Sequence, residues 1–107
     1  MKRGEIWAYQ DKAYGAKPRP AIIMQAKDLE DYDTIMVCPL TSHETYPSNL
    51  RETIKPSKQN GLHDVSFAMT DKLTPLKREH FGYKIGELNE SDMTRLSKKV
   101  TNFLGLK

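Results

Sequence analysis

Short apolar runs, separated by polar segments that contain proline or glycine, occupy most of the chain before residue 86. Runs rich in Val, Ile, Tyr and Trp are typical of β-strands. The expected strands cover residues 5–9, 21–25, 34–40, 50–54, 65–69 and 83–85. The run at 34–40 is apolar at nearly every position, so it is expected to lie centrally in a sheet with both faces buried. Pro39 is expected to close this run, and Pro75 to end the segment that begins at residue 65.

The pattern changes to a helical period near the C-terminus, over residues 90–104. Five apolar residues fall on one face of a helix there, and this stripe is expected to face the core: Met93, Leu96, Val100, Phe103 and Leu104. Asn89 is placed to cap the helix start, and Gly105 stands where a left-handed C-terminal cap is expected. Several short strands followed by one helix predict a mainly β (α+β) fold, a small antiparallel barrel or sandwich with the helix packed on it.

The length of 107 residues predicts one domain, covering residues 1–107. The longest aliphatic run, 21–24, is far shorter than the ~20 apolar residues of a membrane-spanning helix, so no membrane association is expected. No apolar stretch follows the basic N-terminus, which argues against a secretory signal and favours the cytoplasm.

Cys38 is the single cysteine, which excludes an internal disulfide and indicates a small hydrophobe inside a strand.

The net charge of +3 is unevenly distributed along the chain. Residues 1–27 hold six basic and two acidic side chains, whereas residues 28–50 hold five acidic and no basic ones. The segments 51–80 and 81–107 each carry a net charge of +2. Basic segments can present a positive surface to a phosphate backbone, because neutralised phosphates release their counterions. The distribution therefore makes nucleic acid one candidate ligand.

Polar side chains stand immediately beside several of the expected strands. Arg19 lies between two prolines, whose fixed φ angles stiffen the backbone at the entrance to the second strand. Thr41, Ser42 and His43 directly follow the third strand, where a buried strand gives way to an exposed loop that can carry a site. The neighbouring pair Asp71–Lys72 is either a surface ion pair or an acid/base pair.

Motifs of several enzyme classes are absent. The chain has no Gly-x-Gly-x-x-Gly, no P-loop and no Gly-x-Ser-x-Gly. His43, His63 and His80 have no spacing to one another or to Cys38 that suggests a zinc site. Neither a metal nor a cofactor is therefore expected.

Six short motifs occur in an order that resembles the MazF/PemK (Kid-like) toxin family: RGEIW at 3–7, RPAII at 19–23, PLTS at 39–42, DKL at 71–73, IGEL at 85–88 and LGL at 104–106. The resemblance covers nearly the whole chain. It implies a small, strongly twisted, antiparallel SH3-like β-barrel with a C-terminal helix that works as a homodimer. It also implies a toxin, paired with a cognate antitoxin, that cleaves single-stranded RNA sequence-selectively without a metal ion.

The resemblance assigns roles to individual residues. Arg19 is similar to the active-site arginine of the family and Thr41 to its active-site threonine, with Ser42 beside it. Asp71 is similar to an aspartate that has a base role in some members.

Two positions depart from the family pattern. Met69 stands where some members carry an arginine, and the loop 10–18 lacks the histidine that some members use there. Histidine changes its charge near neutral pH, and His43 lies two residues from Thr41. On chemistry alone, His43 is therefore the candidate for proton transfer.

RNA contacts are expected from exposed cations and aromatic rings, in addition to Ser42. Lysines would bind phosphates, and tyrosines would stack on unpaired bases. The candidates are Lys12, Lys17, Lys72, Tyr14 and Tyr46.

Two alternative functions keep the same fold. A DNA gyrase poison like the CcdB family would act, as that resemblance implies, through a Trp-Gly-Ile C-terminus, whereas this chain ends Leu-Gly-Leu-Lys and its sole tryptophan is Trp7. A non-catalytic SH3-like module would use Arg19 and Thr41 for binding alone.

Overall fold

The computed structural model describes residues 1–10, 17–29, 31–44 and 48–106. Within these residues the chain forms seven strands and one α-helix, joined in places by short 3-10 helices: β1 (Glu5–Tyr9), β2 (Arg19–Ile23), β3 (Thr34–Thr41), β4 (Arg51–Ile54), β5 (Ser66–Met69), β6 (Thr74–Lys77), β7 (Phe81–Glu87) and α1 (Glu90–Leu104). The predicted mainly β fold with a C-terminal helix is confirmed.

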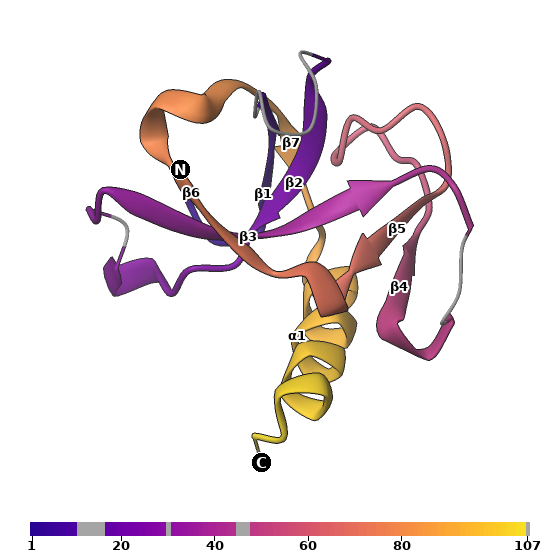
Figure 1. Ribbon diagram of the computed structural model, residues 1–107. Coiled ribbons are helices and arrows are strands. Elements are labelled where there is room, and N and C mark those ends of the chain that lie inside the picture. The colour runs from indigo at the N-terminus through magenta and orange to yellow at the C-terminus, as the bar shows by residue number, and fades with distance from the viewer. Residues whose placement is uncertain (11–16, 30, 45–47, 107) are drawn as a thin grey trace.

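The strands form one branched antiparallel sheet in the order β4-β5-β3-β2-β1-β7, with β6 also paired to β3. Figure 1 shows β3 running across the molecule, with β4 and β5 toward one end of it and α1 below. In the described part of the chain, no pairing joins β4 or β6 to β7. The sheet is therefore strongly bent but is not closed into the complete barrel that the sequence predicted.

Two prolines that were expected to end strands lie inside strands. β3 pairs with β6 as far as Val37 and with β5 from Leu40 onward, so Pro39 falls where β3 changes its neighbour. On that side the missing N–H of Pro39 interrupts no described ladder. Pro75 lies in β6, a strand that the sequence did not predict, and pairs with Met36. Among the described strands β6 pairs only with β3, and an edge position tolerates proline.

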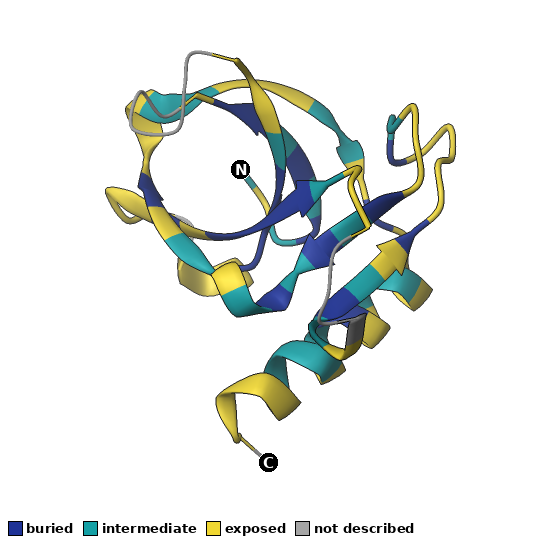
Figure 2. Cartoon of the chain, turned by 45° about the vertical axis from the view of Figure 1, so that its right-hand side comes forward, coloured by how far each residue is buried: buried dark blue, intermediate teal, exposed yellow. Residues whose placement is uncertain are grey.

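Apolar side chains form two cores on opposite faces of β2 and β3. The first core, lying toward α1, contains Ile6, Ile22, Met24, Cys38, Leu40, Ile54, Ala68, Leu88 and Leu96. The second core contains Tyr9, Ala21, Ile23, Ile35, Val37 and Leu76. Alternate residues of β3 enter alternate cores, and Figure 2 shows the buried residues concentrated in the central strands. β3 is buried on both faces from Val37 to Leu40, including Cys38 as predicted, whereas Met36 nearer its start is 39% exposed.

Trp7 and Phe81 cover the second core from its margin. Their ring centroids lie 6.5 Å apart in an edge-to-face arrangement. Trp7 is only partly buried, and its indole Nε1–H donates to Oε1 of Glu5 at 2.9 Å. It is therefore a marginal core residue rather than a central one.

The apolar stripe of α1 faces the first core only along part of the helix. Leu96 is fully buried, and Met93 and Val100 pack against the first core. Phe103 and Leu104 are 43% and 50% exposed, so the prediction that the whole stripe is buried is wrong for the last turn. α1 packs against β4 and the 3-10 helix η4 (Thr70–Lys72), and its last turn extends past them.

Both ends of α1 carry the predicted caps. Oδ1 of Asn89 accepts a hydrogen bond from the N–H of Asp92 at 2.7 Å, and Gly105 has a φ of +72°. No helix within the described residues is long and apolar enough to span a membrane.

Candidate active site

Arg19 and Thr41 lie at adjoining ends of β2 and β3. Ala21 pairs with Pro39 in this antiparallel ladder. The printed pairs of this ladder end at Ala21 and Pro39, and the same register continued by two residues would place Arg19 opposite Thr41. Directly opposite residues of an antiparallel pair project to the same face of the sheet. On that register the two predicted residues would project to the same face of the sheet.

The backbone of Arg19 is fixed by its pairing with β1. Arg19 pairs with Tyr9 of β1, and Pro20 pairs with Ala8. β2 begins two residues earlier than predicted, because proline's φ near −65° is compatible with an extended strand end. The side chain of Arg19 is exposed although its backbone is part of the sheet.

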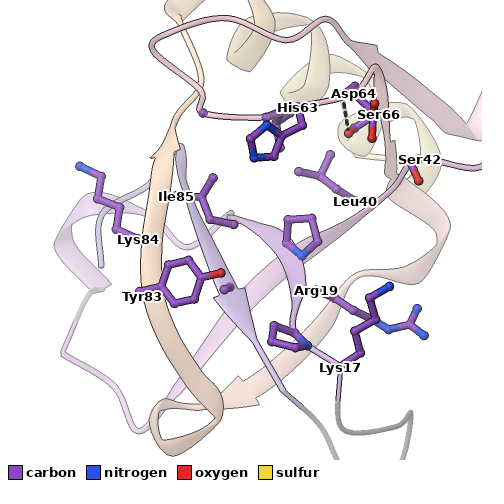
Figure 3. Close-up of a pocket in the computed structure, with 15 residues that line it drawn as sticks. Lys17, Arg19, Leu40, Ser42, His63, Asp64, Ser66, Tyr83, Lys84 and Ile85 are labelled. Atoms are coloured by element: carbon purple, nitrogen blue, oxygen red, sulfur yellow. Dashed lines mark hydrogen bonds between the residues drawn. The ribbon is translucent and has the colours of Figure 1, made fainter.

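A groove of about 690 Å³ opens beside these strand ends. Its walls come from β2 with the residues before it, the end of β3, the segment between β4 and β5, and β7. Figure 3 shows Lys17 and Arg19 at one edge, His63 at the opposite edge and Tyr83 on the β7 side. Of the predicted site residues, Lys17, Arg19 and Ser42 line the groove.

Among the described residues that line this groove, the cations Lys17, Arg19 and Lys84 outnumber the one carboxylate, that of Asp64. Nζ of Lys84 lies 3.2 Å from Oε2 of Glu5, which neutralises part of its charge. Within the described residues, the guanidinium of Arg19 enters no hydrogen bond or ion pair. A free guanidinium presents a planar fork of donors to phosphate oxygens, so the groove is suited to a phosphodiester.

The chain turns at the end of β3, and the hydroxyl group of Thr41 stabilises this turn. Oγ1 of Thr41 accepts a hydrogen bond from the backbone N–H of His43 at 3.2 Å. Thr41 is half-buried, Ser42 reaches the groove, and His43 is exposed and does not line it. The roles of Thr41 and His43 in catalysis stay predictions.

Asp71 lies apart from the groove. Its carboxylate, on η4, forms an ion pair with Arg51 of β4, whose side chain is only 7% exposed. Arg51 lies across from Met69 in the β4–β5 ladder, so a guanidinium reaches Asp71 from the neighbouring strand. Asp71 is thus paired neither with Lys72 nor with the groove residues. Lys72 is exposed on η4 and does not line the groove either.

Three predicted RNA contacts, Lys12, Tyr14 and Tyr46, fall outside the described residues. Among the side chains that the structure describes, no group of three or more His, Cys, Asp or Glu residues is arranged to hold a metal ion.

The groove also contains residues that the sequence did not single out as site residues: His63, Tyr83 and Lys84. The Asn-Gly pair at 60–61 indicates a turn before His63. No pattern in the sequence, however, shows that this turn packs against β7 and so reaches the groove.

Comparison with known proteins gives the family. A family model described as the PemK-like, MazF-like toxin of type II toxin–antitoxin systems matches residues 2–104. The chain belongs to this family. The MazF/PemK resemblance of the six motifs is thereby confirmed. A relative named "Probable endoribonuclease MazF", from Mycolicibacterium smegmatis, is 36% identical over 107 residues, which cover 99% of this chain and 98% of that protein.

Solved structures of MazF toxins have the same fold. Mycobacterium tuberculosis toxin MazF-mt6 aligns with a TM-score of 0.80 at 21% identity, covering 96% of this chain and 98% of that one. A MazE–MazF structure from Deinococcus radiodurans aligns with a TM-score of 0.77 at 19% identity, covering 100% and 97%. At these identities the likeness establishes the fold of the chain.

Proposed function

We propose that this MazF/PemK family member is the toxin of a type II toxin–antitoxin system and cleaves single-stranded RNA without a metal ion. The observation that carries the proposal is the exposed Arg19 side chain, which lines a groove with more cations than carboxylates beside the end of β3. The relative from M. smegmatis named as a probable endoribonuclease supports the same activity.

RNA carries its own nucleophile, so cleavage needs little beyond positioning and charge stabilisation. The 2′-hydroxyl attacks the adjacent phosphorus and expels the 5′-oxygen, leaving a cyclic phosphate. Arg19 stays protonated and suits the extra negative charge of the pentavalent phosphorane. Thr41 and Ser42 would hydrogen-bond a phosphoryl oxygen or orient the nucleophile. Removing one such preorganised donor typically costs about 2.7 to 4 kcal/mol of transition-state stabilisation.

The groove also suggests how RNA would be held. Lys17 at one edge would bind a neighbouring phosphate, and Tyr83, which is 61% exposed, would offer a ring for base stacking. Lys12, Tyr14, Tyr46 and Lys72 remain predicted contacts. Sequence selectivity would arise from the side chains around these positions.

We further propose an antitoxin and a second copy of the chain as partners. A mycobacterial endoribonuclease with its cognate antitoxin and MazE–MazF complexes are among the similar structures. An acidic antitoxin segment would fit the positive groove at Arg19 and compete with RNA. The apolar side chains exposed at the end of α1 would suit a homodimer contact.

The test is to incubate the purified chain with a long unstructured RNA in EDTA, alongside Arg19→Ala and Thr41→Ala. The wild type should cut at a few fixed sequences, and both variants should lose at least about 100-fold in rate. Arg95→Ala, which removes an exposed arginine of α1 outside the groove, is the matched control and should cut normally. Thermal melting must show that each variant is folded. Intact RNA with the folded wild-type chain would contradict the proposal.

A further inference from the structure

The segment between β4 and β5 is a preformed loop built around one buried amide. Asn60 is 2% exposed. Its Oδ1 accepts hydrogen bonds from the N–H groups of Ser57 at 2.9 Å and Leu62 at 3.0 Å, and its Nδ2 donates to the carbonyl of Lys55 at 2.8 Å. A buried amide whose donors and acceptors are paired fixes the path of the backbone around it.

This loop also packs closely against β7, with one glycine in the loop and one in β7 at the contact. Gly61 has a φ of +70°, and a Cβ there would lie 2.3 Å from the carbonyl oxygen of Ile85. A Cβ on Gly86 would lie 2.4 Å from the backbone of Asn60. The N–H of Glu87 donates to the carbonyl of Gln59 at 3.0 Å. The two backbones therefore approach more closely than any larger residue would allow.

The loop between β4 and β5 places His63 at the groove. Figure 3 shows its ring extending from the loop toward the groove, on the side opposite Lys17 and Arg19. Within the described residues, neither imidazole nitrogen of His63 enters a hydrogen bond or ion pair. An exposed histidine side chain without a partner, next to a loop whose backbone is fixed, can exchange a proton with a bound ligand.

We propose that His63 is the proton donor to the departing 5′-oxygen of RNA, an assignment that rests on the RNA cleavage proposed above. Histidine is the side chain that ordinarily changes its charge between pH 5 and 8. His63 is the histidine among the groove-lining residues, whereas His43 is not one of them. The charged and titratable groups that share the groove with it are Asp64 of its own loop, Tyr83 and Lys84 of β7, and Lys17 and Arg19 at the β2 edge.

The step balances as a transesterification. The 2′-oxygen forms its bond to phosphorus and loses its proton to solvent water. The bond from phosphorus to the 5′-oxygen breaks, and that oxygen takes a proton from the imidazolium of His63, which is left neutral. Water then reprotonates the imidazole. In-line attack places the two oxygens on opposite sides of phosphorus, so a donor on the wall facing away from the attacking hydroxyl is required.

The experiment compares His63→Ala with His43→Ala on two RNA substrates. Mapping of the wild-type products first gives the cleaved linkage, and an oligonucleotide is then made with sulfur in place of its bridging 5′-oxygen. A thiolate leaves without protonation. His63→Ala should cut the oxygen substrate about 10² to 10⁴-fold more slowly than wild type but the sulfur substrate within about 10-fold. His43→Ala tests the rival candidate for the same role, and if His63 is the donor, the sulfur substrate should bring no rescue to His43→Ala.

A pH profile adds a second readout. The wild-type rate should fall as pH rises, because the donor must be protonated, and His63→Ala should lose that decline. Wild-type rates for His63→Ala on the oxygen substrate would overturn the proposal. So would equal slowing on both substrates, which would indicate binding or structure instead. A rescue seen with His43→Ala would move the role to His43, whereas an inactive wild type would refute RNA cleavage itself.

Discussion

Cys38 shows how one position combines packing and electrostatics. Burial raises the pKa of its thiol to about 12, with the nearby Asp71 carboxylate adding to the rise and the Arg51 guanidinium opposing it. Because the thiolate is the reactive form, the folded protein should react with a disulfide reagent at pH 8 at least about 100-fold more slowly than in guanidinium chloride. Absorbance of the released thiol measures this. Equal rates in both solvents would show that the interior is open.

Glu5 makes stability depend on pH. Burial raises the pKa of its carboxyl. Hydrogen bonds from the N–H of Lys2 and the indole of Trp7, together with the ammonium of Lys84, lower the pKa by more than burial raises it, so the net pKa lies below 4.5. Because its pKa is lower in the folded state, the ionised carboxylate of Glu5 stabilises the fold above about pH 4.5. This stabilisation is lost as the pH falls through the pKa of the folded state.

Glu5→Gln should therefore be less stable than the wild type at pH 7, by about 1 kcal/mol, the typical net contribution of one hydrogen bond. That difference should shrink toward pH 3. Urea unfolding at both pH values gives the two free energies. A gap that widens on acidification would mean that the carboxylate is not stabilised by these partners.

Part of the candidate site could be predicted from the sequence, because some of its residues lie at the ends of strands that the apolar runs reveal. Arg19 and Ser42 were found from their places beside apolar runs, and both reach the groove. Asp71 was assigned by resemblance, but Arg51, 20 residues away along the chain, pairs with it. His63 was not assigned because its place at the groove depends on packing between distant backbones.

At the level of elements, the contact between the β4–β5 loop and β7 has a direct test. Gly86→Ala should lower the free energy of unfolding by about 1 to 3 kcal/mol, because its Cβ would meet the Asn60 backbone. RNA cleavage should also fall at temperatures where the variant is folded. Gly82→Ala is the matched control on the same strand, because its Cβ would lie 3.8 Å from the carbonyl of Ala8. Equal melting temperatures for the two variants would contradict the close approach.

The strand order could not have been read from local patterns. Apolar runs predicted β1 and β3 nearly to their ends, and helical periodicity with its caps predicted α1. β6 was not predicted, because Pro75 was expected to end a strand. Among the described strands β6 pairs only with β3, and this edge position accommodates the proline. Barrel closure came from resemblance, whereas the branch at Pro39 depends on pairing between distant segments.

At the level of the whole molecule, apolar surface at the end of α1 supports self-association. Phe103, Leu104 and Leu106 are 43%, 50% and 59% exposed. We expect light scattering after gel filtration to give twice the chain mass. The double variant Phe103→Glu/Leu106→Glu should give a single chain mass while keeping its helical circular dichroism. A wild type that stays monomeric at high micromolar concentration would exclude this contact.

The positive groove should make RNA binding sensitive to salt. With an RNA blocked by a 2′-deoxy nucleotide at the cleavage site, log K should fall linearly with log salt. Lys17→Ala should reduce the slope by about 0.7, the contribution of one phosphate on a single strand. Lys58→Ala, which removes an exposed lysine that does not line the groove, is the control and should keep the wild-type slope. Fluorescence anisotropy at several salt concentrations measures both.

The position of β3 between two sets of neighbours has a practical consequence. A break in the chain between Glu44 and Ser48 would leave β1, β2 and β3 on one fragment and their partners β5, β6 and β7 on the other. Neither fragment alone can cover its apolar strands, so the halves would complement each other only when both are made. We expect such a split protein to be active only in cells in which both fragments are expressed, each from its own promoter.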